Sequence, residues 1–273
     1  MRAVSTRTTA IVTGASSGIG AQCARLLAAR GYDVVVVARR IERLEALAKE
    51  IEAAHGVRAT PIQLDIAAPG AAQSLFAKTA GAGMVVEVLV NNAGFGTQGF
   101  FPDIPWEKTA EQLQLNVVSL TELSQRFTAA MRARGGGYVL NVASIGAYMP
   151  VPGYATYAAG KAYVRNFSEA LAHELRDSGV RVCCLCPGPT ETEFIAVAGQ
   201  SVPAWQKIAF MSAERCARIG IRALFRGRRL VVSGFLNTLM MWWLRWLPRR
   251  LITWSAGLFM EGPRAGHLRS PDP

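Results

Sequence analysis

Short runs of β-branched residues alternate with longer helical patterns along most of this chain of 273 residues. Seven of these runs predict strands, at residues 9–13, 33–38, 58–64, 85–90, 137–143, 180–186 and 229–233. Residues 34–37 are four consecutive valines, which is typical of a strand buried on both faces of a sheet. Strands that alternate with helices indicate a parallel sheet covered on both sides. The sequence therefore predicts an α/β fold, with a single doubly wound, Rossmann-type domain of about seven parallel strands.

Helices are expected between these strands, the clearest at residues 18–30, 41–54, 107–134 and 154–178. The alternation continues to residue 233 without an internal repeat or a low-complexity linker. We therefore expect one domain at residues 1–233 and a separate helical extension at residues 234–273.

A glycine-rich turn joins the first predicted strand to the first helix. Gly14 permits a tight turn, and Gly18 and Gly20 let the backbone approach a ligand without a Cβ collision. The new helix presents unpaired N–H groups and a positive dipole end to a pyrophosphate. In this strand–turn–helix context the spacing favours dinucleotide binding over a purely structural turn. The residues expected to contact the cofactor here are Gly14, Ser16, Ser17, Gly18, Ile19 and Gly20.

Arg39 and Arg40 follow the second predicted strand, where a dinucleotide-binding fold meets the adenosine ribose. An NAD site would have an acidic residue at this position, but Asp33 lies at the opposite end of the strand. Two guanidinium groups could bind a 2′-phosphate, whereas cations at the start of a helix are otherwise unfavourable. The sequence thus favours NADP(H) over NAD, with a solvated arginine pair as the alternative.

Tyr157 and Lys161 are four residues apart in a predicted helix, so their side chains share one face. An ammonium group beside a phenol stabilises the phenolate, so we expect Lys161 to lower the pKa of Tyr157 from about 10 toward neutrality. Such a phenol can donate a proton to a carbonyl oxygen or accept one from an alcohol. Tyr154 and Tyr163 have no lysine at the same spacing and are not expected to have this role.

Over residues 9–233 the chain resembles the short-chain dehydrogenase/reductase family, because each motif follows its predicted strand in the family's order. Besides the glycine turn and the Tyr157/Lys161 pair, the resemblance rests on Asp65, Asn91-Asn92-Ala93-Gly94, Asn116, Ser144 and Pro187-Gly188-Pro189-Thr190-Glu191-Thr192.

The resemblance implies roles for these residues in hydride transfer between a nicotinamide cofactor and a carbonyl or alcohol. Tyr157 is implied as the general acid/base and Ser144 as the hydrogen-bonding partner of the substrate oxygen. Lys161 would hold the nicotinamide ribose, and Asn116 would anchor a water in a proton relay. The remaining implied cofactor contacts are Asp65 at the adenine, Asn91 and Gly94 at the adenosine, Thr192 at the carboxamide, and Ala93, Pro187 and Gly188. Asn92 and Asn116 each have a structural alternative. Asn92 could be a turn residue, and Asn116 could form hydrogen bonds with backbone groups.

Apolar segments follow the later strands, where such folds recognise their substrates. They include Phe95, Phe100, Phe101, residues 147–151 and residues 194–210, with almost no charge apart from Lys207. They predict a hydrophobic pocket for a small-molecule carbonyl or alcohol of lipid-, acyl- or steroid-like character. Packing within a lid, or contact with a second subunit, is the alternative.

The positive charge of the chain is concentrated near its C-terminal end. Of the net charge of +11, residues 215–273 carry eleven arginines against two acidic residues, a net of +9. Two apolar helices, at residues 234–247 and 251–260, are expected here, too short to cross a bilayer. Tryptophan and arginine beside an apolar stripe fit a membrane surface through residues 234–260, and packing on the protein itself or on a second subunit are the alternatives. Nucleic acid is not an expected partner, because the arginines are interleaved with large apolar residues.

The cysteines and the N-terminal residues indicate the compartment. Five cysteines, an odd number, do not suggest a disulfide framework. On a strand, Cys184 and Cys186 share one face and Cys183 takes the other, so we expect buried thiols and no metal site. The N-terminal residues lack the apolar core of a signal peptide, which favours a cytoplasmic protein, with peripheral membrane attachment as the alternative.

The sequence therefore favours an NADP(H)-dependent oxidoreductase that reduces a ketone or aldehyde. A non-catalytic NADP(H)-binding scaffold and a membrane-recruited interaction protein are the competing functions. Family resemblance also implies a homodimer or a higher homo-oligomer formed through helices 107–134 and 154–178.

Overall fold

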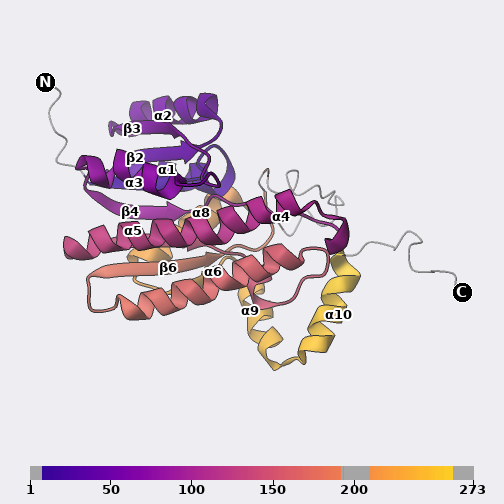
Figure 1. Cartoon of the computed structure of the whole chain (residues 1–273). Coiled ribbons are helices and arrows are strands. Elements are labelled where there is room, and N and C mark those ends of the chain that lie inside the picture. The colour runs from indigo at the N-terminus through magenta and orange to yellow at the C-terminus, as the bar shows by residue number, and fades with distance from the viewer. Residues whose placement is uncertain (1–7, 192, 194–209, 261–273) are drawn as a thin grey trace, which may run out of the picture.

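The computed structural model describes residues 8–191, 193 and 210–260 of the chain (Figure 1). Its centre is a seven-stranded sheet of order β3-β2-β1-β4-β5-β6-β9, in which every neighbouring pair is parallel. These strands are β1 (Thr9–Thr13), β2 (Asp33–Ala38), β3 (Ala59–Gln63), β4 (Val86–Asn91), β5 (Gly137–Val142), β6 (Val180–Cys186) and β9 (Leu230–Val232). The predicted doubly wound sheet is confirmed, and each predicted strand is present.

Helices follow most of the strands and lie on both faces of the sheet. They are α1 (Gly18–Ala28), α2 (Ile41–His55), α3 (Ala71–Lys78), α4 (Trp106–Leu113), α5 (Leu120–Ala133), α6 (Ala155–Glu174) and α8 (Ala213–Phe225). Short 3₁₀ turns occur at Ala80–Ala82, Phe101–Asp103 and Ile145–Tyr148. The single helix predicted at residues 107–134 is divided, because a π-helical turn at Gln114–Ser119 separates α4 from α5.

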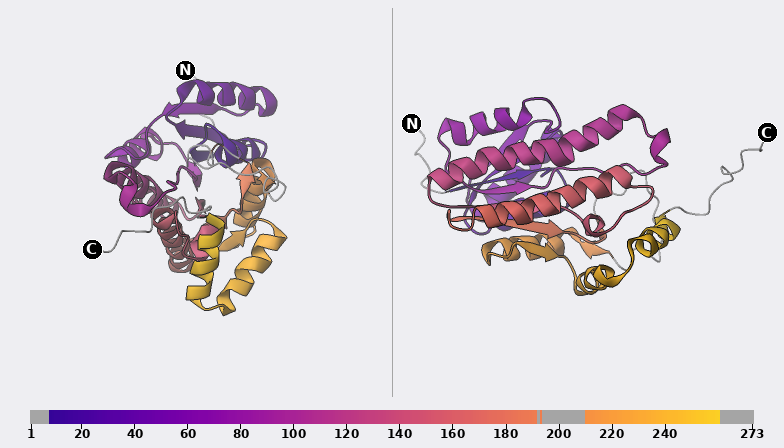
Figure 2. Two further views of the ribbon diagram at one scale, coloured as in Figure 1. Left: turned by 90° about the vertical axis from the view of Figure 1, so that its right-hand side faces the viewer. Right: turned by 60° about the horizontal axis from the view of Figure 1, so that its bottom comes forward.

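Helices lie on both faces of the sheet (Figure 2), and two apolar layers hold them to it. Side chains of α1, α2 and α8 pack on one face, and side chains of α3, α5 and α6 pack on the other. Strand β2 shows how one strand serves both layers: Val34 and Val36 enter the first, whereas Val35 and Val37 enter the second. The valine run is therefore buried on both faces, as its composition predicted.

A second, two-stranded sheet lies at the carboxyl end of β6. Strand β7 (Thr190–Glu191) pairs in parallel with β8 (Met211–Ser212). This pairing places β7, shortly after the end of β6, next to the start of α8. It therefore fixes where the chain returns to the domain.

The predicted C-terminal helices are present as α9 (Phe235–Trp243) and α10 (Arg249–Met260), joined by a 3₁₀ turn at Leu244–Trp246. They lie at the margin of the domain in all three views (Figures 1 and 2). Among the helices that the structure describes, none combines the length and apolar character needed to span a bilayer. The division into a domain at residues 1–233 and an extension at 234–273 stays a prediction.

All five cysteines are buried and carry free thiols. The predicted faces of β6 are observed: Cys183 enters the core layer of α1, α2 and α8, while Cys184 and Cys186 lie together on the other face. Their two Sγ atoms are 3.9 Å apart.

The core layers predict that substitution of two phenylalanines lowers the free energy of unfolding by very different amounts. Phe127 on α5 is fully buried, whereas Phe100 is 70% exposed. We expect Phe127→Ala to lower the free energy of unfolding by about 3–5 kcal/mol, because it removes a buried ring and leaves a cavity. Phe100→Ala is the matched control and should change it by less than about 0.5 kcal/mol in the same urea titration. Similar losses from the two substitutions would contradict the packing described here.

Candidate active site

The glycine turn has the geometry of an anion-binding loop. Gly14 has a φ of +66°, in the left-handed region. A Cβ on Gly20 would lie 2.3 Å from the Gly14 carbonyl oxygen, so no larger residue fits there without a shift of the backbone. The N-cap residue of α1, Ser17, makes no side-chain capping bond. The first N–H groups of α1 are therefore available to an anion.

Side-chain hydrogen bonds hold this turn against the end of β4. Asn92 Nδ2 donates to the carbonyl oxygens of Thr13 and Gly14, at 3.0 and 3.2 Å. The backbone N–H groups of Asn92 and Ala93 both donate to Thr13 Oγ1, at 3.0 and 3.1 Å. Asn92 is thus a structural residue of the turn, and the amide of Ala93 serves the same contact.

The side chain of Asn91 lies in the interior, so only its backbone could line the adenosine, and that expectation stays a prediction. The side chain is buried, and its Nδ2 donates to Ser124 Oγ at 3.0 Å and to Asn141 Oδ1 at 2.9 Å. The physical reason is the alternation of side chains along β4, which directs Asn91 into the interior when Asn92 faces the turn. Ile19 likewise packs partly against the core below the turn.

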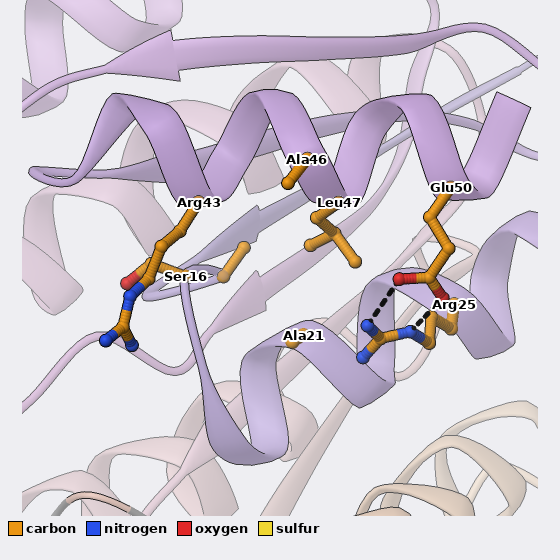
Figure 3. A pocket seen from close by; sticks show the side chains of 8 residues that line it. Ser16, Ala21, Arg25, Arg43, Ala46, Leu47 and Glu50 are labelled. Atoms are coloured by element: carbon orange, nitrogen blue, oxygen red, sulfur yellow. Dashed lines mark hydrogen bonds and ion pairs between the residues drawn. The ribbon is translucent and has the colours of Figure 1, made fainter.

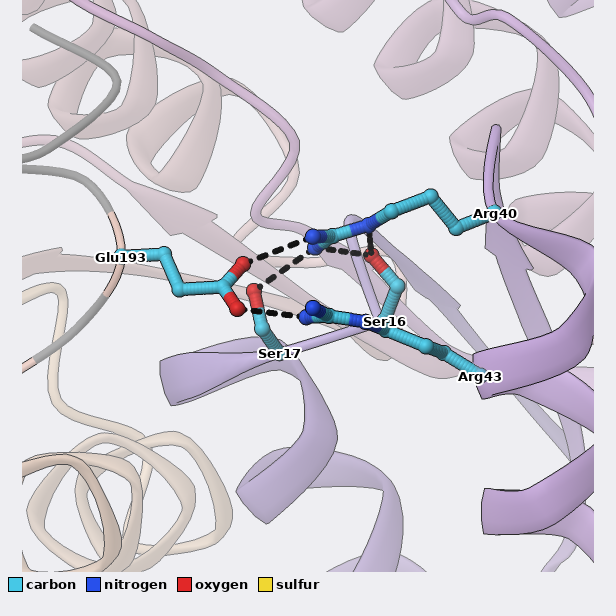
Figure 4. A network of polar contacts seen from close by, with 5 residues as sticks. All are labelled: Ser16, Ser17, Arg40, Arg43 and Glu193. Atoms are coloured by element: carbon cyan, nitrogen blue, oxygen red, sulfur yellow. Dashed lines mark hydrogen bonds and ion pairs between the residues drawn. The ribbon is translucent and has the colours of Figure 1, made fainter.

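Two arginines converge on one carboxylate beside the glycine turn (Figure 4). Arg40 donates to the hydroxyls of Ser16 and Ser17 at 2.9 and 3.2 Å. Arg40 Nη1 also lies 2.8 Å from Glu193 Oε2, and Arg43 Nη1 lies 2.5 Å from Glu193 Oε1. Hydrogen bonds from Arg43 and Arg40 lower the pKa of Glu193 to about 2. The cluster therefore binds an oxyanion with two guanidinium groups.

The predicted pair of Arg39 and Arg40 is divided between two places. The Arg39 guanidinium is 3.4 Å from Glu111 and 3.8 Å from Asp65, away from the Glu193 carboxylate. Arg43 takes the second position instead. Its spacing of three residues from Arg40 could have indicated this, because α2 begins at Ile41 and such neighbours meet on one side of a helix. Glu193 lies 153 residues from Arg40, and no local pattern in the sequence pointed to it.

Asn116 lies in the π-helical turn and is buried. Its Oδ1 accepts the N–H of Phe95 at 3.2 Å, and its Nδ2 donates to the Phe95 carbonyl at 2.8 Å. The side chain thus partners backbone groups, which was the structural alternative. A Cβ on Gly94 would lie 2.8 Å from Asn116 Oδ1 and 3.4 Å from Lys161 Nζ. These contacts bring Gly94, Asn116 and Lys161 together.

Ser144 and Tyr157 meet at the carboxyl end of β5. Ser144 is the N-cap of the 3₁₀ turn Ile145–Tyr148, and its Oγ accepts the N–H of Gly146 at 3.1 Å. A hydrogen bond between Ser144 and the Tyr157 phenol acts to lower the phenol's pKa. The two hydroxyls expected to face a substrate oxygen are therefore in contact.

Lys161 does not acidify Tyr157 in this structure, contrary to expectation. Burial is the largest influence on both groups: it raises the pKa of Tyr157 to about 12 and lowers that of Lys161 to about 8. Lys161 Nζ donates to the carbonyl of Val142 at 2.8 Å and lies 5.8 Å from the centre of the Tyr157 ring. Because Tyr157 and Lys161 are four residues apart, they share one face of α6. The loss of water around both side chains outweighs the attraction between the ammonium group and a phenolate.

Hydrogen bonds hold the segment after β6 beside the turn that follows Ser144. The carbonyl of Pro187 accepts the N–H of Ile145 at 2.9 Å, and the N–H of Gly188 donates to Ser233 Oγ at 3.1 Å. Thr192 and residues 194–209 lie outside the residues that the structure describes, so the expectations for them remain predictions. Phe100 and Phe101 are 70% and 53% exposed, so neither lies in an enclosed pocket.

A hollow of about 250 Å³ lies between α1 and α2 (Figure 3). Ser16 and Arg43 line part of it, and an ion pair of 2.7 Å between Arg25 and Glu50 crosses another part. None of the four predicted catalytic residues lines this hollow. Within the part of the chain that the structure describes, no group of three or more His, Cys, Asp or Glu is placed to hold a metal ion.

The residues present fit a nicotinamide dinucleotide. Uncapped N–H groups and two converging guanidinium groups lie at one end of the carboxyl edge of the sheet, and Ser144, Tyr157 and Lys161 lie farther along it. Gly94 leaves the space between the turn and Lys161 without a side chain. This is the edge at which open α/β sheets bind their ligands.

Comparison with known proteins agrees with this geometry. The family model described as short chain dehydrogenase matches residues 8–202. An uncharacterized oxidoreductase of Myxococcus xanthus is 36% identical over 196 residues, which are 71% of this chain and 77% of that protein. The 7beta-hydroxysteroid dehydrogenase of Collinsella aerofaciens is 34% identical over 231 residues, which are 83% of this chain and 86% of that enzyme.

A solved structure of a short-chain dehydrogenase from Sphingobium yanoikuyae in complex with NADPH aligns with a TM-score of 0.78 at 28% identity. The alignment covers 88% of this chain and 96% of that one. The chain belongs to the short-chain dehydrogenase/reductase family, as its motifs predicted. It is therefore an oxidoreductase that works with a nicotinamide cofactor.

Burial of Lys161 makes stability depend on pH. Its pKa falls from 10.5 to about 8 on folding, so between these values the unfolded chain binds a proton that the folded chain does not. The free energy of unfolding therefore decreases as the pH is lowered through this range, by about 2 kcal/mol between about pH 10 and about pH 8. Urea titrations of wild type and Lys161→Met should diverge by that amount over this range.

Lys108→Met is the control, because Lys108 is exposed. Its difference from wild type should stay constant over the same range. A constant difference for Lys161→Met as well would mean that Lys161 keeps its ordinary pKa in the folded chain.

Proposed function

We propose that this protein is an NADP(H)-dependent carbonyl reductase that acts on a ketone or aldehyde of a hydrophobic, lipid-, acyl- or steroid-like substrate. The observation that carries the proposal is the contact of Ser144 with Tyr157, beside the buried Lys161, at the same sheet edge as the anion-binding turn. The reverse reaction, oxidation of a secondary alcohol, uses the same groups.

Tyr157 is in the protonated state that reduction requires. The bound nicotinamide supplies the hydride that reaches the carbonyl carbon. Ser144 and Tyr157 bind the carbonyl oxygen and stabilise the negative charge that develops there. A phenol whose pKa is raised to about 12 is protonated at neutral pH, so Tyr157 holds the proton that the oxygen must receive. The products are the alcohol and a phenolate, which takes up a proton from solvent.

Lys161 supports this step when the phenol loses its proton. With a pKa of about 8, its amine is mostly charged at neutral pH, and it lies 5.8 Å from the centre of the phenol ring. The attraction between ammonium and phenolate then opposes the desolvation that disfavours the anion. We assign Lys161 this role together with a contact to the nicotinamide ribose, and Asn116 the role of holding the loop at Phe95 and Gly94 in place.

The cofactor preference rests on Arg40 and Arg43. Their bound carboxylate, Glu193, marks the point at which an oxyanion sits between the two guanidinium groups. A 2′-phosphate carries more charge than a carboxylate and would compete for the same donors. The NADPH complex of the Sphingobium yanoikuyae enzyme supports this choice. We assign Arg39, beside Asp65, to the adenine instead.

The substrate class rests on the apolar residues after the strands and on the likeness to a hydroxysteroid dehydrogenase. We also propose a cytoplasmic protein that forms a homodimer or a higher homo-oligomer. Helices α5 and α6 lie on the same face of the sheet. Val118, in the π-helical turn before α5, and Tyr163, on α6, are 48% and 40% exposed and offer a surface for a second copy.

Removal of the phenol hydroxyl tests the catalytic assignment. We expect Tyr157→Phe to lower kcat for reduction of a hydrophobic ketone by about 10²- to 10⁴-fold, because the proton donor is lost. The dissociation constant for NADPH should change little, since the ring remains. The measurement is NADPH oxidation by absorbance over a panel of steroid, acyl and aromatic ketones.

Tyr163→Phe is the matched control on the same helix, and it should keep activity within about threefold of wild type. If wild type oxidises NADPH with no compound of the panel but binds NADPH tightly, the non-catalytic scaffold is the better description. Equal activity of Tyr157→Phe and wild type would overturn the assigned mechanism.

Substitution of Arg40 and Glu193, which meet beside the glycine turn, tests the cofactor preference. Arg40→Gln should raise the dissociation constant for NADPH by about 10- to 100-fold, because a charge-assisted contact to the 2′-phosphate is lost, and leave that for NADH nearly unchanged. Glu193→Gln should lower the constant for NADPH, because the competing carboxylate is removed. Fluorescence titrations measure these dissociation constants for the variants and for wild type.

Arg58→Gln removes the same charge at the opposite edge of the sheet and serves as the control. Its affinity for both cofactors should equal that of wild type. A parallel loss of NADH and NADPH affinity in Arg40→Gln would show that the cluster does not recognise the 2′-phosphate.

A further inference from the structure

The C-terminal hairpin, defined as residues 235–260 with α9, the turn Leu244–Trp246 and α10, exposes many large apolar side chains. Eleven large apolar side chains on it are between 42% and 81% exposed. They are Phe235, Leu236, Leu239, Met240, Trp242, Trp243, Trp246, Leu247, Leu251, Trp254 and Leu258. A patch of this kind on a protein surface indicates a binding surface.

Part of the hairpin is already packed. Met241, Ile252 and Ala256 are buried, at 2%, 5% and 9% exposure. Asn237 Nδ2 donates to the Ser233 carbonyl at 2.7 Å and so attaches α9 to the end of β9. The exposed side chains therefore form a second, outward side, and the expected alternative that the extension packs only on its own domain does not account for them.

The charge of this surface has one sign. Arg245, Arg249 and Arg250 are exposed, and none takes part in an ion pair among the described residues. Residues 215–260 contain no aspartate or glutamate. Arg249 and Arg250 begin α10, where the helix dipole disfavours cations, so helix stability does not explain their presence. Their position fits an external anion.

We propose that the C-terminal hairpin binds the surface of a membrane that contains anionic lipids, and lies in the interface without crossing it. Exposed tryptophans next to arginines suit the boundary between headgroups and acyl chains. Trp242, Trp243 and Trp246 form one aromatic cluster, with ring centres 5.1 and 6.4 Å apart. A second copy of the chain fits this surface less well, because a symmetric contact would bring its arginines together with no acidic residue of the hairpin to pair them.

The hairpin adjoins the candidate active site. Helix α9 lies against the turn Ile145–Tyr148, which follows Ser144. Asn237 also lies so close to Gly188 that a Cβ there would be 2.1 Å from Nδ2. A membrane bound to the hairpin would therefore lie near the site and give it access to apolar molecules in the bilayer. The binding itself does not depend on the proposed reaction.

Co-sedimentation with lipid vesicles tests the proposal on the full-length protein. We expect binding to vesicles of equal parts phosphatidylcholine and phosphatidylglycerol, with a blue shift of tryptophan fluorescence, and much weaker binding to phosphatidylcholine alone. Arg249→Gln with Arg250→Gln should weaken binding to the anionic vesicles about 30-fold, since each arginine near such a surface contributes about fivefold to the affinity. Added salt should weaken binding by the wild type in the same direction.

Arg226→Gln with Arg228→Gln is the matched control, because both residues are exposed and precede β9, whereas the hairpin follows it. This variant should bind as the wild type does. Trp246→Gln with Trp254→Gln should reduce binding to both kinds of vesicle, and thermal unfolding should show that each variant remains folded.

Failure of the folded wild type to bind anionic vesicles would overturn the proposal, as would equal binding by the two arginine variants. A mass in solution that falls in Trp246→Gln with Trp254→Gln, without any vesicle binding by wild type, would assign the hairpin to contact between copies instead. Vesicle binding by a protein that reduces no ketone would leave this proposal standing and remove only the proposed reaction.

Discussion

The removal of water around Lys161 and Tyr157 is the constraint on which the candidate site depends. Lys161 is buried and Tyr157 is partly buried, and desolvation disfavours the ionised form of each, so the phenol keeps its proton and the lysine holds its proton weakly. The Val142 carbonyl accepts a hydrogen bond that holds the lysine, and the hydrogen bond with Ser144 holds the phenol. Reduction requires a phenol that still carries its proton when negative charge develops on the substrate oxygen. A phenol that is already ionised could not donate one.

Positive charge serves two separate places on the molecule. Near the glycine turn, Arg40 and Arg43 share one carboxylate, which balances part of their charge within the chain. On the C-terminal hairpin, three exposed arginines have no acidic neighbour in the surrounding sequence. The first arrangement suits a small anion that displaces a side chain, whereas the second suits an extended surface of like-charged groups. The high net charge of the chain is therefore not one property with one explanation.

Most of the fold could be predicted because its signals are local. The valines of β2 reported burial on both faces, and the order of the motifs reported which strand ends meet at one edge of a parallel sheet. The helix predicted at residues 107–134 concealed a π-helical turn, since propensity does not distinguish a wider turn from an ordinary one. Asn91 and Asn92 show the same limit at the site: only the register of β4 decided which of the two supports the glycine turn and which enters the interior.

By itself the sequence determined the parallel sheet, the anion-binding turn and the residue types at the reaction centre, because periodicity and spacing act within a few residues. The tertiary structure alone decided how strongly water is excluded from Lys161 and Tyr157, and it reversed the expected direction of the phenol's pKa. It also decided that Glu193 meets two arginines 150 or more positions away, and that one side of the C-terminal hairpin stays uncovered. Desolvation, long-range pairing and exposure depend on which distant segments become neighbours, and that follows only when the whole chain is folded.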